Sequence, residues 1–133
     1  MKEALLDTDI LSAFFRNNGP VVTNANVYLQ QYRTLNFSII SYYEIMNGLL
    51  YKDANNQRQR FSTFSSVNNI IPLTIVVANY AANIFATLRK EGQPIGHTDS
   101  LIAGIALAHN LELITNNTAH FKRVAGLQIN NWL

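Results

Sequence analysis

Short apolar runs recur along the chain and have the length expected of buried strands. Their leucine and isoleucine content favours this interpretation. Pro72 places the third run near a sheet edge, because proline cannot donate a hydrogen bond to a neighbouring strand. Five runs qualify, and the last is the weakest: Ala4 to Leu6, Phe37 to Ile40, Ile70 to Leu73, Glu112 to Thr115 and Gln128 to Asn130.

Helix-length segments lie between these runs, with glycine and proline at several of their ends. Strands that alternate with helices predict an α/β fold with a mainly parallel sheet covered on both faces. No repeat, low-complexity tract or linker interrupts the pattern, so residues 1–133 are predicted to form a single domain. The helical segments are Val21 to Arg33, Tyr42 to Tyr51, Asn55 to Val67, Ile75 to Glu91 and Thr98 to His109.

The composition limits the chemistry open to the chain. Because the chain has no cysteine, disulfides, thiolate metal sites and cysteine nucleophiles are excluded, which leaves oxygen and imidazole ligands. No apolar stretch approaches the roughly 20 residues that cross a bilayer, and the N-terminus lacks a signal-peptide pattern. We therefore expect a cytoplasmic protein with no membrane contact. The net charge of +2 is compatible with a polyanionic partner but too small to establish one.

Three polar residues are expected at one edge of the predicted sheet. Asp7 directly follows the first strand, Glu44 comes shortly after the second, and Asn117 comes shortly after the fourth. Ligand sites in open parallel sheets collect beyond the carboxyl ends of the strands, where the loops converge. The sequence therefore predicts that these side chains lie at the same end of the sheet.

Each of the acids near these strands also has a structural explanation. Asp9 is expected to cap the short helix after the first strand, whereas Asp7 stands one residue too early for an easy cap. Glu44 completes a capping box in which Ser41 would cap the helix and Glu44 would reach back to it. A functional interpretation of Glu44 therefore depends on its companions.

Asp99 opens a predicted helix, where the positive end of the helix dipole favours a carboxylate. It shares a helical stripe with Ile102, Ala103 and Ala106, the apolar face turned toward the sheet, so its carboxylate should point inward. A buried carboxylate without a positive partner is costly. A divalent cation would meet that requirement.

The remaining polar candidates give weaker signals. The segment from Thr115 to Thr118 offers hydroxyl and amide oxygens, either as a turn and helix cap or as weak contacts to a metal. The three histidines lack the spacing of a ligand set, and only His97, two residues before Asp99, could reach the mouth of the site.

Taken together, four motifs resemble the PIN domain, specifically the VapC toxins. No single motif is specific, but their order and spacing match over nearly the whole chain, and the closing segment from Gly126 to Trp132 also resembles the family's usual ending. The motifs are Leu5 to Leu11 (LLDTDIL), Ser41 to Leu49 (SYYEIMNGL), Gly96 to Ala103 (GHTDSLIA) and Thr115 to Phe121 (TNNTAHF).

The resemblance implies a PIN-like three-layer α/β/α fold with a five-stranded parallel sheet, and endonucleolytic cleavage of RNA that depends on Mg²⁺ or Mn²⁺. By motif, Asp7, Glu44 and Asp99 would be the metal-binding and catalytic acids. Where many members carry a fourth acid this chain has Asn117, which leaves one or two metal ions open. The resemblance also implies a homodimer and a cognate antitoxin protein.

Further residues would support such a site. Hydroxyl and amide groups beside the acids would orient them or a water molecule, and cationic groups would meet the RNA phosphates. The first group comprises Asn117, Thr8, Ser41 and Thr115, and the second Arg16, Arg89, Lys90, Lys122 and Arg123.

Two other interpretations stay open at this point. Asp7 and Asp9 mimic the acid pair of haloacid-dehalogenase-like phosphatases. The chain lacks that family's later acidic pair, however, and the region before Asp99 offers only Lys90 as the required catalytic lysine. A catalytically silent PIN-like module that binds RNA or a protein, with the acids serving as caps, is the second alternative.

Overall fold

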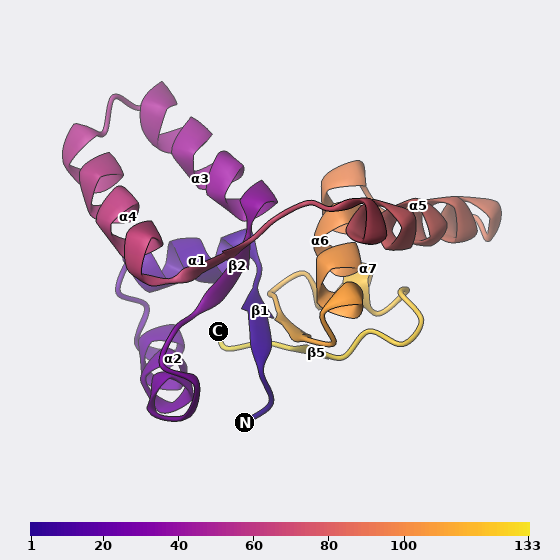
Figure 1. Cartoon of the computed structure of the whole chain (residues 1–133), viewed down its shortest axis with the longest axis horizontal. Coiled ribbons are helices and arrows are strands. Elements are labelled where there is room, and N and C mark those ends of the chain that lie inside the picture. Colours follow the sequence, from indigo (N-terminus) through magenta and orange to yellow (C-terminus); the bar gives the residue numbers. More distant parts are fainter.

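The five predicted strands form one parallel sheet in the computed structural model, which describes residues 1–133 (Figure 1). Their order across the sheet is β3-β2-β1-β4-β5, and every neighbouring pair is parallel. The predicted parallel sheet and the edge position of the third strand are therefore confirmed. The strands are β1 (Ala4–Leu6), β2 (Asn36–Ser38), β3 (Asn69–Ile71), β4 (Glu112–Ile114) and β5 (Ile129–Asn130).

Helices cover both faces of the sheet, which gives the predicted three-layer α/β/α arrangement. In Figure 1 the first four helices lie on one side of the strands and the last three on the other. No helix is both long and apolar enough to span a membrane. The helices are α1 (Thr8–Phe15), α2 (Gly19–Tyr32), α3 (Ile39–Tyr51), α4 (Asn55–Val67), α5 (Ile75–Lys90), α6 (His97–Ala108) and α7 (Thr118–Phe121).

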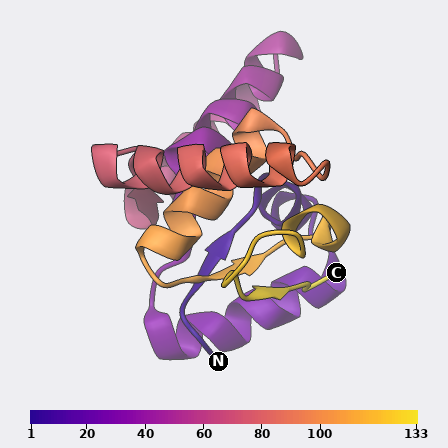
Figure 2. The same cartoon turned by 90° about the vertical axis from the view of Figure 1, so that its right-hand side faces the viewer.

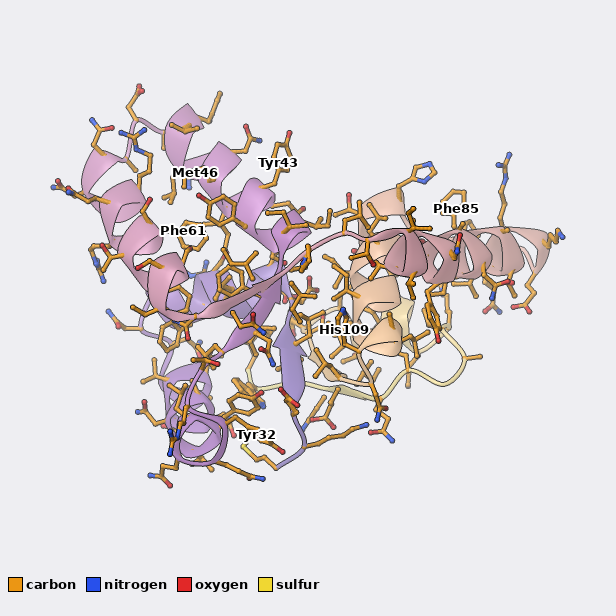
Figure 3. All side chains as sticks on the ribbon, in the orientation of Figure 1. Tyr32, Tyr43, Met46, Phe61, Phe85 and His109 are labelled. Atoms are coloured by element: carbon orange, nitrogen blue, oxygen red, sulfur yellow. The ribbon has the colours of Figure 1, made fainter.

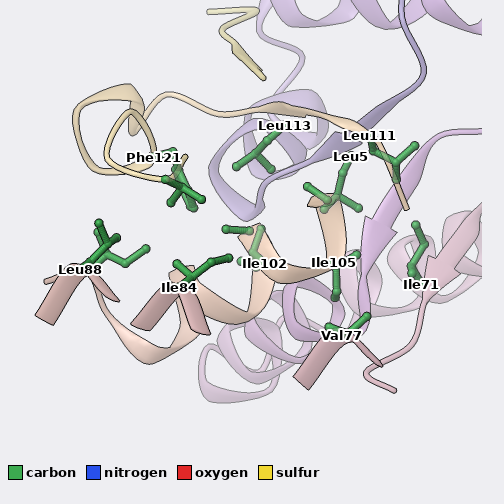
Figure 4. Close-up of a cluster of buried hydrophobic side chains, with 14 residues drawn as sticks. Leu5, Ile71, Val77, Ile84, Leu88, Ile102, Ile105, Leu111, Leu113 and Phe121 are labelled. Atoms are coloured by element: carbon green, nitrogen blue, oxygen red, sulfur yellow. The ribbon is translucent and has the colours of Figure 1, made fainter. Parts of the chain in front are cut away.

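The central strand β1 is buried on both faces, which fixes its register. Leu5 joins the apolar cluster under α5, α6 and α7, whereas Ala4 and Leu6 join the cluster under α1, α2 and α4. Successive side chains of a strand point to opposite faces, so a shift of one residue would exchange the two sets. Figure 4 shows Leu5 among the first of these clusters, beside Ile102 and Ile105 of α6.

The start of α3 differs from the prediction. Ser38 is the N-cap, and its side-chain oxygen accepts a hydrogen bond from the backbone N–H of Ser41 at 2.9 Å. The second strand consequently ends at Ser38 instead of Ile40, and the helix begins at Ile39 instead of Tyr42. The predicted capping box headed by Ser41 is therefore wrong, since Ser41 lies inside the first turn.

Helix α6, which carries Asp99, is held against the sheet by α5. Figure 2 shows α5 crossing α6. At the crossing, a Cβ atom on Gly104 would lie 3.0 Å from both the Cβ and the backbone nitrogen of Ala81. The absence of a side chain at Gly104 lets the two helices approach closely, and this contact fixes where α6 begins.

Candidate active site

Asp7 stands at the carboxyl end of the central strand and is almost fully buried, with 7% of its surface exposed. Its carboxylate accepts the backbone N–H of Thr8 and the hydroxyl of Thr115, each at 2.8 Å. Asp7 is also the N-cap of α1. The expectation that Asp9 would cap this helix is therefore wrong, because only Asp7 separates the end of β1 from the start of α1.

Burial is the main cause that raises the pKa of Asp7, from 3.8 to about 7. The charges of Asp9 and Asp99 raise the pKa further, and the hydrogen bonds from Thr115 and Thr8 lower it. The carboxylate thus sits among other acids in a place poor in water. A positive charge nearby would favour its ionised form.

Asp9 connects α1 to the loop after β4. One carboxylate oxygen accepts the N–H of Ile10 at 2.7 Å, and the other accepts the N–H of Asn116 at 3.0 Å. Burial raises the pKa of Asp9, and the two hydrogen bonds oppose the shift. Both oxygens are therefore engaged in a structural clamp.

Glu44 lies on the first turns of α3 and is exposed to solvent. It does not reach back to a helix cap. Its carboxylate accepts a hydrogen bond from the Thr8 hydroxyl at 2.7 Å, and the same hydroxyl lies 2.8 Å from that of Ser41. The start of α1 and the first turns of α3 are joined here by side chains.

Asp99 occupies the first turn of α6, and its side chain is 26% exposed. The predicted stripe is confirmed, because Ile102, Ala103 and Ala106 on the same helical face are all buried. A ring nitrogen of His120, Nδ1, lies 3.5 Å from the Asp99 carboxylate. Asp99 thus faces α7 across the end of the sheet.

The motif-based prediction missed His120. Its Nδ1 atom lies 3.0 Å from the side-chain amide nitrogen of Asn117, whose backbone N–H donates to the Thr115 hydroxyl at 3.0 Å. The spacing of three residues between Asn117 and His120, on a short helix, was the available signal. Asn117 therefore orients an imidazole beside Asp99.

His97 does not reach the site mouth through any contact with these groups. Its ring stacks on Phe85, with centroids 4.1 Å apart and an interplanar angle of 16°. Figure 3 shows Phe85 on α5. His109 is the C-cap of α6, at the opposite end of that helix from Asp99. The sequence-based view that the histidines form no ligand set agrees with this placement.

The acids approach one another without forming a closed ligand set. Asp7, Asp9 and Asp99 influence each other electrostatically, and Thr8 links Glu44 to this group. No three histidine, aspartate or glutamate side chains converge closely enough to hold an ion as they stand. No lysine or arginine pairs with these carboxylates, and their one basic neighbour is the imidazole of His120, whose Nδ1 lies 3.5 Å from Asp99.

The donor chemistry nevertheless fits a hard divalent cation. Carboxylate and hydroxyl oxygens gather here, since Thr115 bonds Asp7 and Thr8 bonds Glu44, and such oxygens are the ligands that Mg²⁺ and Mn²⁺ prefer. Accumulated negative charge without a protein counter-charge is costly, and a cation would relieve it. Glu44 is exposed and Asp99 is partly exposed, so their side chains have room to turn toward an ion.

The cations suggested for RNA contact are spread around the molecule. Arg16 lines a cavity of about 390 Å³ between α1, α3 and α4, together with Lys52 and Arg60. Arg123 donates to the carbonyl oxygen of Pro94 at 3.0 Å, so it also supports the loop before α6. The other three, Arg89, Lys90 and Lys122, are exposed.

Known proteins resemble this chain in sequence. Residues 4–127 match the model of the PIN domain. The chain is 32% identical over 132 residues to "Ribonuclease VapC1" of Haemophilus influenzae (strain R2866), covering 96% of each protein. It is 36% identical over 69 residues to "tRNA(fMet)-specific endonuclease VapC" of Shigella flexneri, about half of each chain (52%).

A solved structure extends the comparison to three dimensions. The fold superposes with a TM-score of 0.86 on a chain from the crystal structure of VapBC2 from Rickettsia felis bound to a DNA fragment from its promoter. The two chains are 28% identical, and the match covers 98% of each. The agreement with the PIN domain in sequence and fold decides against the haloacid-dehalogenase-like alternative.

Proposed function

This chain belongs to the PIN-domain family, and from that premise we propose that it is a divalent-cation-dependent endoribonuclease, the toxin of a toxin–antitoxin pair. The observation that carries the proposal is the group of acids at the carboxyl end of the sheet. One of them, Asp7, is buried, and none has a lysine or arginine partner. Relatives of similar length named as ribonucleases support the activity.

We assign the cation, Mg²⁺ or Mn²⁺, to Asp7, Glu44 and Asp99. When bound, it would supply Lewis-acid activation for hydrolysis of the phosphodiester. Asn117, which stands where many family members carry a fourth acid, is neutral. The site therefore carries one negative charge fewer than an equivalent site with four acids. We therefore favour one strongly bound ion over two.

The protein's own contribution is to fix the positions of the acids through hydrogen bonds. Thr115 and the backbone of Thr8 fix both oxygens of Asp7 before any ligand arrives. Asn117 holds His120 at the edge of Asp99. Preorganised groups need little rearrangement when charge develops in the reaction, which is how such sites lower a barrier. In this proposal, four polar residues position the acids and do not themselves bind the cation: Thr8, Ser41, Thr115 and Asn117.

The partners follow from the same assignment. The substrate is RNA, so we expect the protein to act in the cytoplasm. Structures of VapBC complexes from Rickettsia felis and from Salmonella typhimurium contain chains of this fold, which supports a cognate antitoxin as the protein partner. The homodimer implied by the resemblance stays a prediction.

Metal dependence tests the proposal. Protein stripped with EDTA should leave a labelled RNA intact, and addition of excess Mn²⁺ or Mg²⁺ should restore cleavage, because the acids alone offer no nucleophile. Gel analysis of the RNA after incubation measures this. Parallel incubation with Ca²⁺, a larger ion of the same charge, tests whether neutralising the acids is sufficient. Cleavage that continues in EDTA would contradict the proposed chemistry.

A further inference from the structure

Thr8 contacts two of the three proposed ligands, which belong to different elements. Its backbone N–H donates to Asp7 at 2.8 Å, and its hydroxyl donates to Glu44 at 2.7 Å. The contact with Thr8 is the one hydrogen bond that the Glu44 carboxylate makes within the protein. An exposed glutamate otherwise samples many rotamers, so this bond decides where its carboxylate lies.

The direction of the hydrogen bonds around Thr8 follows from the number of protons. A carboxylate only accepts, so the single hydroxyl proton of Thr8 is used on Glu44. The 2.8 Å contact between Thr8 and Ser41 must then be donated by the Ser41 hydroxyl. The Ser41 oxygen in turn accepts from the Ser38 hydroxyl at 3.3 Å. A chain runs from Ser38 through Ser41 and Thr8 to Glu44.

Burial keeps this hydroxyl chain in place. Ser38 and Ser41 are both fully buried, so water cannot compete for their hydroxyls, and buried polar groups require protein partners. Ser38 is also the N-cap of α3 and accepts the N–H of Ser41 at 2.9 Å. The chain is thus anchored at the start of α3, the helix that carries Glu44, and it passes through Thr8, whose backbone N–H donates to Asp7.

We infer that Thr8 is the positioning residue that holds Glu44 toward Asp7, and that the hydroxyl chain behind it sets the affinity of the site for a divalent cation. This inference rests on the proposed function, because it assumes that both acids bind the cation. It assigns to Thr8 a role distinct from binding: its hydroxyl donates to Glu44 and accepts from Ser41, and so positions a ligand.

Isothermal titration with MnCl₂ tests this role. The change Thr8→Val removes the hydroxyl and keeps the branched shape, and it should weaken Mn²⁺ binding roughly 10-fold, the lower end of the loss seen when a group that orients a ligand is removed. Thr8→Ser keeps the hydroxyl and should restore binding to within about 3-fold. Thr63→Val is the matched control, because its hydroxyl bonds only the carbonyl oxygen of Gln59 on the surface of α4.

A double-mutant cycle separates positioning from a general structural effect. In a Glu44→Gln background, Thr8→Val should cause no further loss of Mn²⁺ affinity, since the carboxylate that Thr8 holds is gone. Should Thr8→Val fail to fold, Ser41→Ala interrupts the same chain one step earlier and should weaken Mn²⁺ binding by roughly 3-fold.

Two results would overturn the inference in distinguishable ways. If Glu44→Gln weakens Mn²⁺ binding but Thr8→Val does not, the role of Thr8 is wrong and the proposed function stands. If neither variant changes Mn²⁺ binding, Glu44 is not a ligand, and the assignment in the proposed function fails together with the inference.

Discussion

Replacing Asp7 by asparagine should reduce RNA cleavage roughly 1,000-fold, equivalent to about 4 kcal/mol of transition-state stabilisation. The change is nearly isosteric and retains an oxygen that can accept from Thr8 or Thr115, so the fold should persist. It removes the one acid that is both buried and at the end of the central strand. Initial rates on a labelled RNA with saturating Mn²⁺ measure the effect.

Asp53→Asn is the matched control for this substitution. Asp53 lies in the exposed turn between α3 and α4 with φ of 52°, a conformation that asparagine also adopts readily. The control makes the same chemical change and likewise removes one carboxylate. A full rate in Asp7→Asn, or an equal loss in Asp53→Asn, would contradict the assignment of Asp7.

Asp7→Asn should also stabilise the metal-free protein at high pH. Burial raises the pKa of Asp7 from 3.8 to about 7, so ionisation favours the unfolded chain. The protonated carboxyl of Asp7 favours the folded state. Its contribution to the free energy of unfolding is therefore complete below pH 3.8, falls as the pH rises, and is lost above about 7. At about 1.4 kcal/mol for each pKa unit, the loss reaches up to about 4 kcal/mol at pH 8.

Urea unfolding of both proteins in EDTA measures this difference. Asp7→Asn should be the more stable protein at pH 8, and its advantage should shrink as the pH is lowered to 5. Comparison of the two proteins at each pH cancels the titration of groups that they share. Addition of Mn²⁺ at pH 8 should stabilise the natural protein more than the variant. A stability difference that does not change with pH would contradict the burial argument.

Local pattern was sufficient to predict the sheet. The strand Ala4–Leu6 is bounded as the apolar run suggested, because its three side chains are buried on both faces and the run ends abruptly at Asp7. The inward register of Asp99 followed from its helical stripe for a similar reason. Which side chains are buried can be predicted from the spacing of apolar residues along the chain.

The side-chain network could not be predicted in the same way. Ser38 and Ser41 are both good helix caps, and local sequence does not rank them, so the start of α3 was misplaced. The bond from Thr8 to Glu44 depends on how α1 and α3 approach across the end of the sheet. His120 belongs to the candidate site only because α6 brings Asp99 within 3.5 Å of its ring nitrogen. Contacts of this kind arise from tertiary packing.

The most direct test of the three-acid site compares the Mn²⁺ affinities of four single variants with that of the natural protein. Isothermal titration should show losses of at least 10-fold in Asp7→Asn, Glu44→Gln and Asp99→Asn, because each removes a charged ligand. Asp9→Asn should stay within about 3-fold of the natural affinity, because Asp9 is not among the proposed ligands and its carboxylate joins the start of α1 to the loop after β4. A large loss in Asp9→Asn together with an unchanged affinity in Glu44→Gln would contradict the three-acid site.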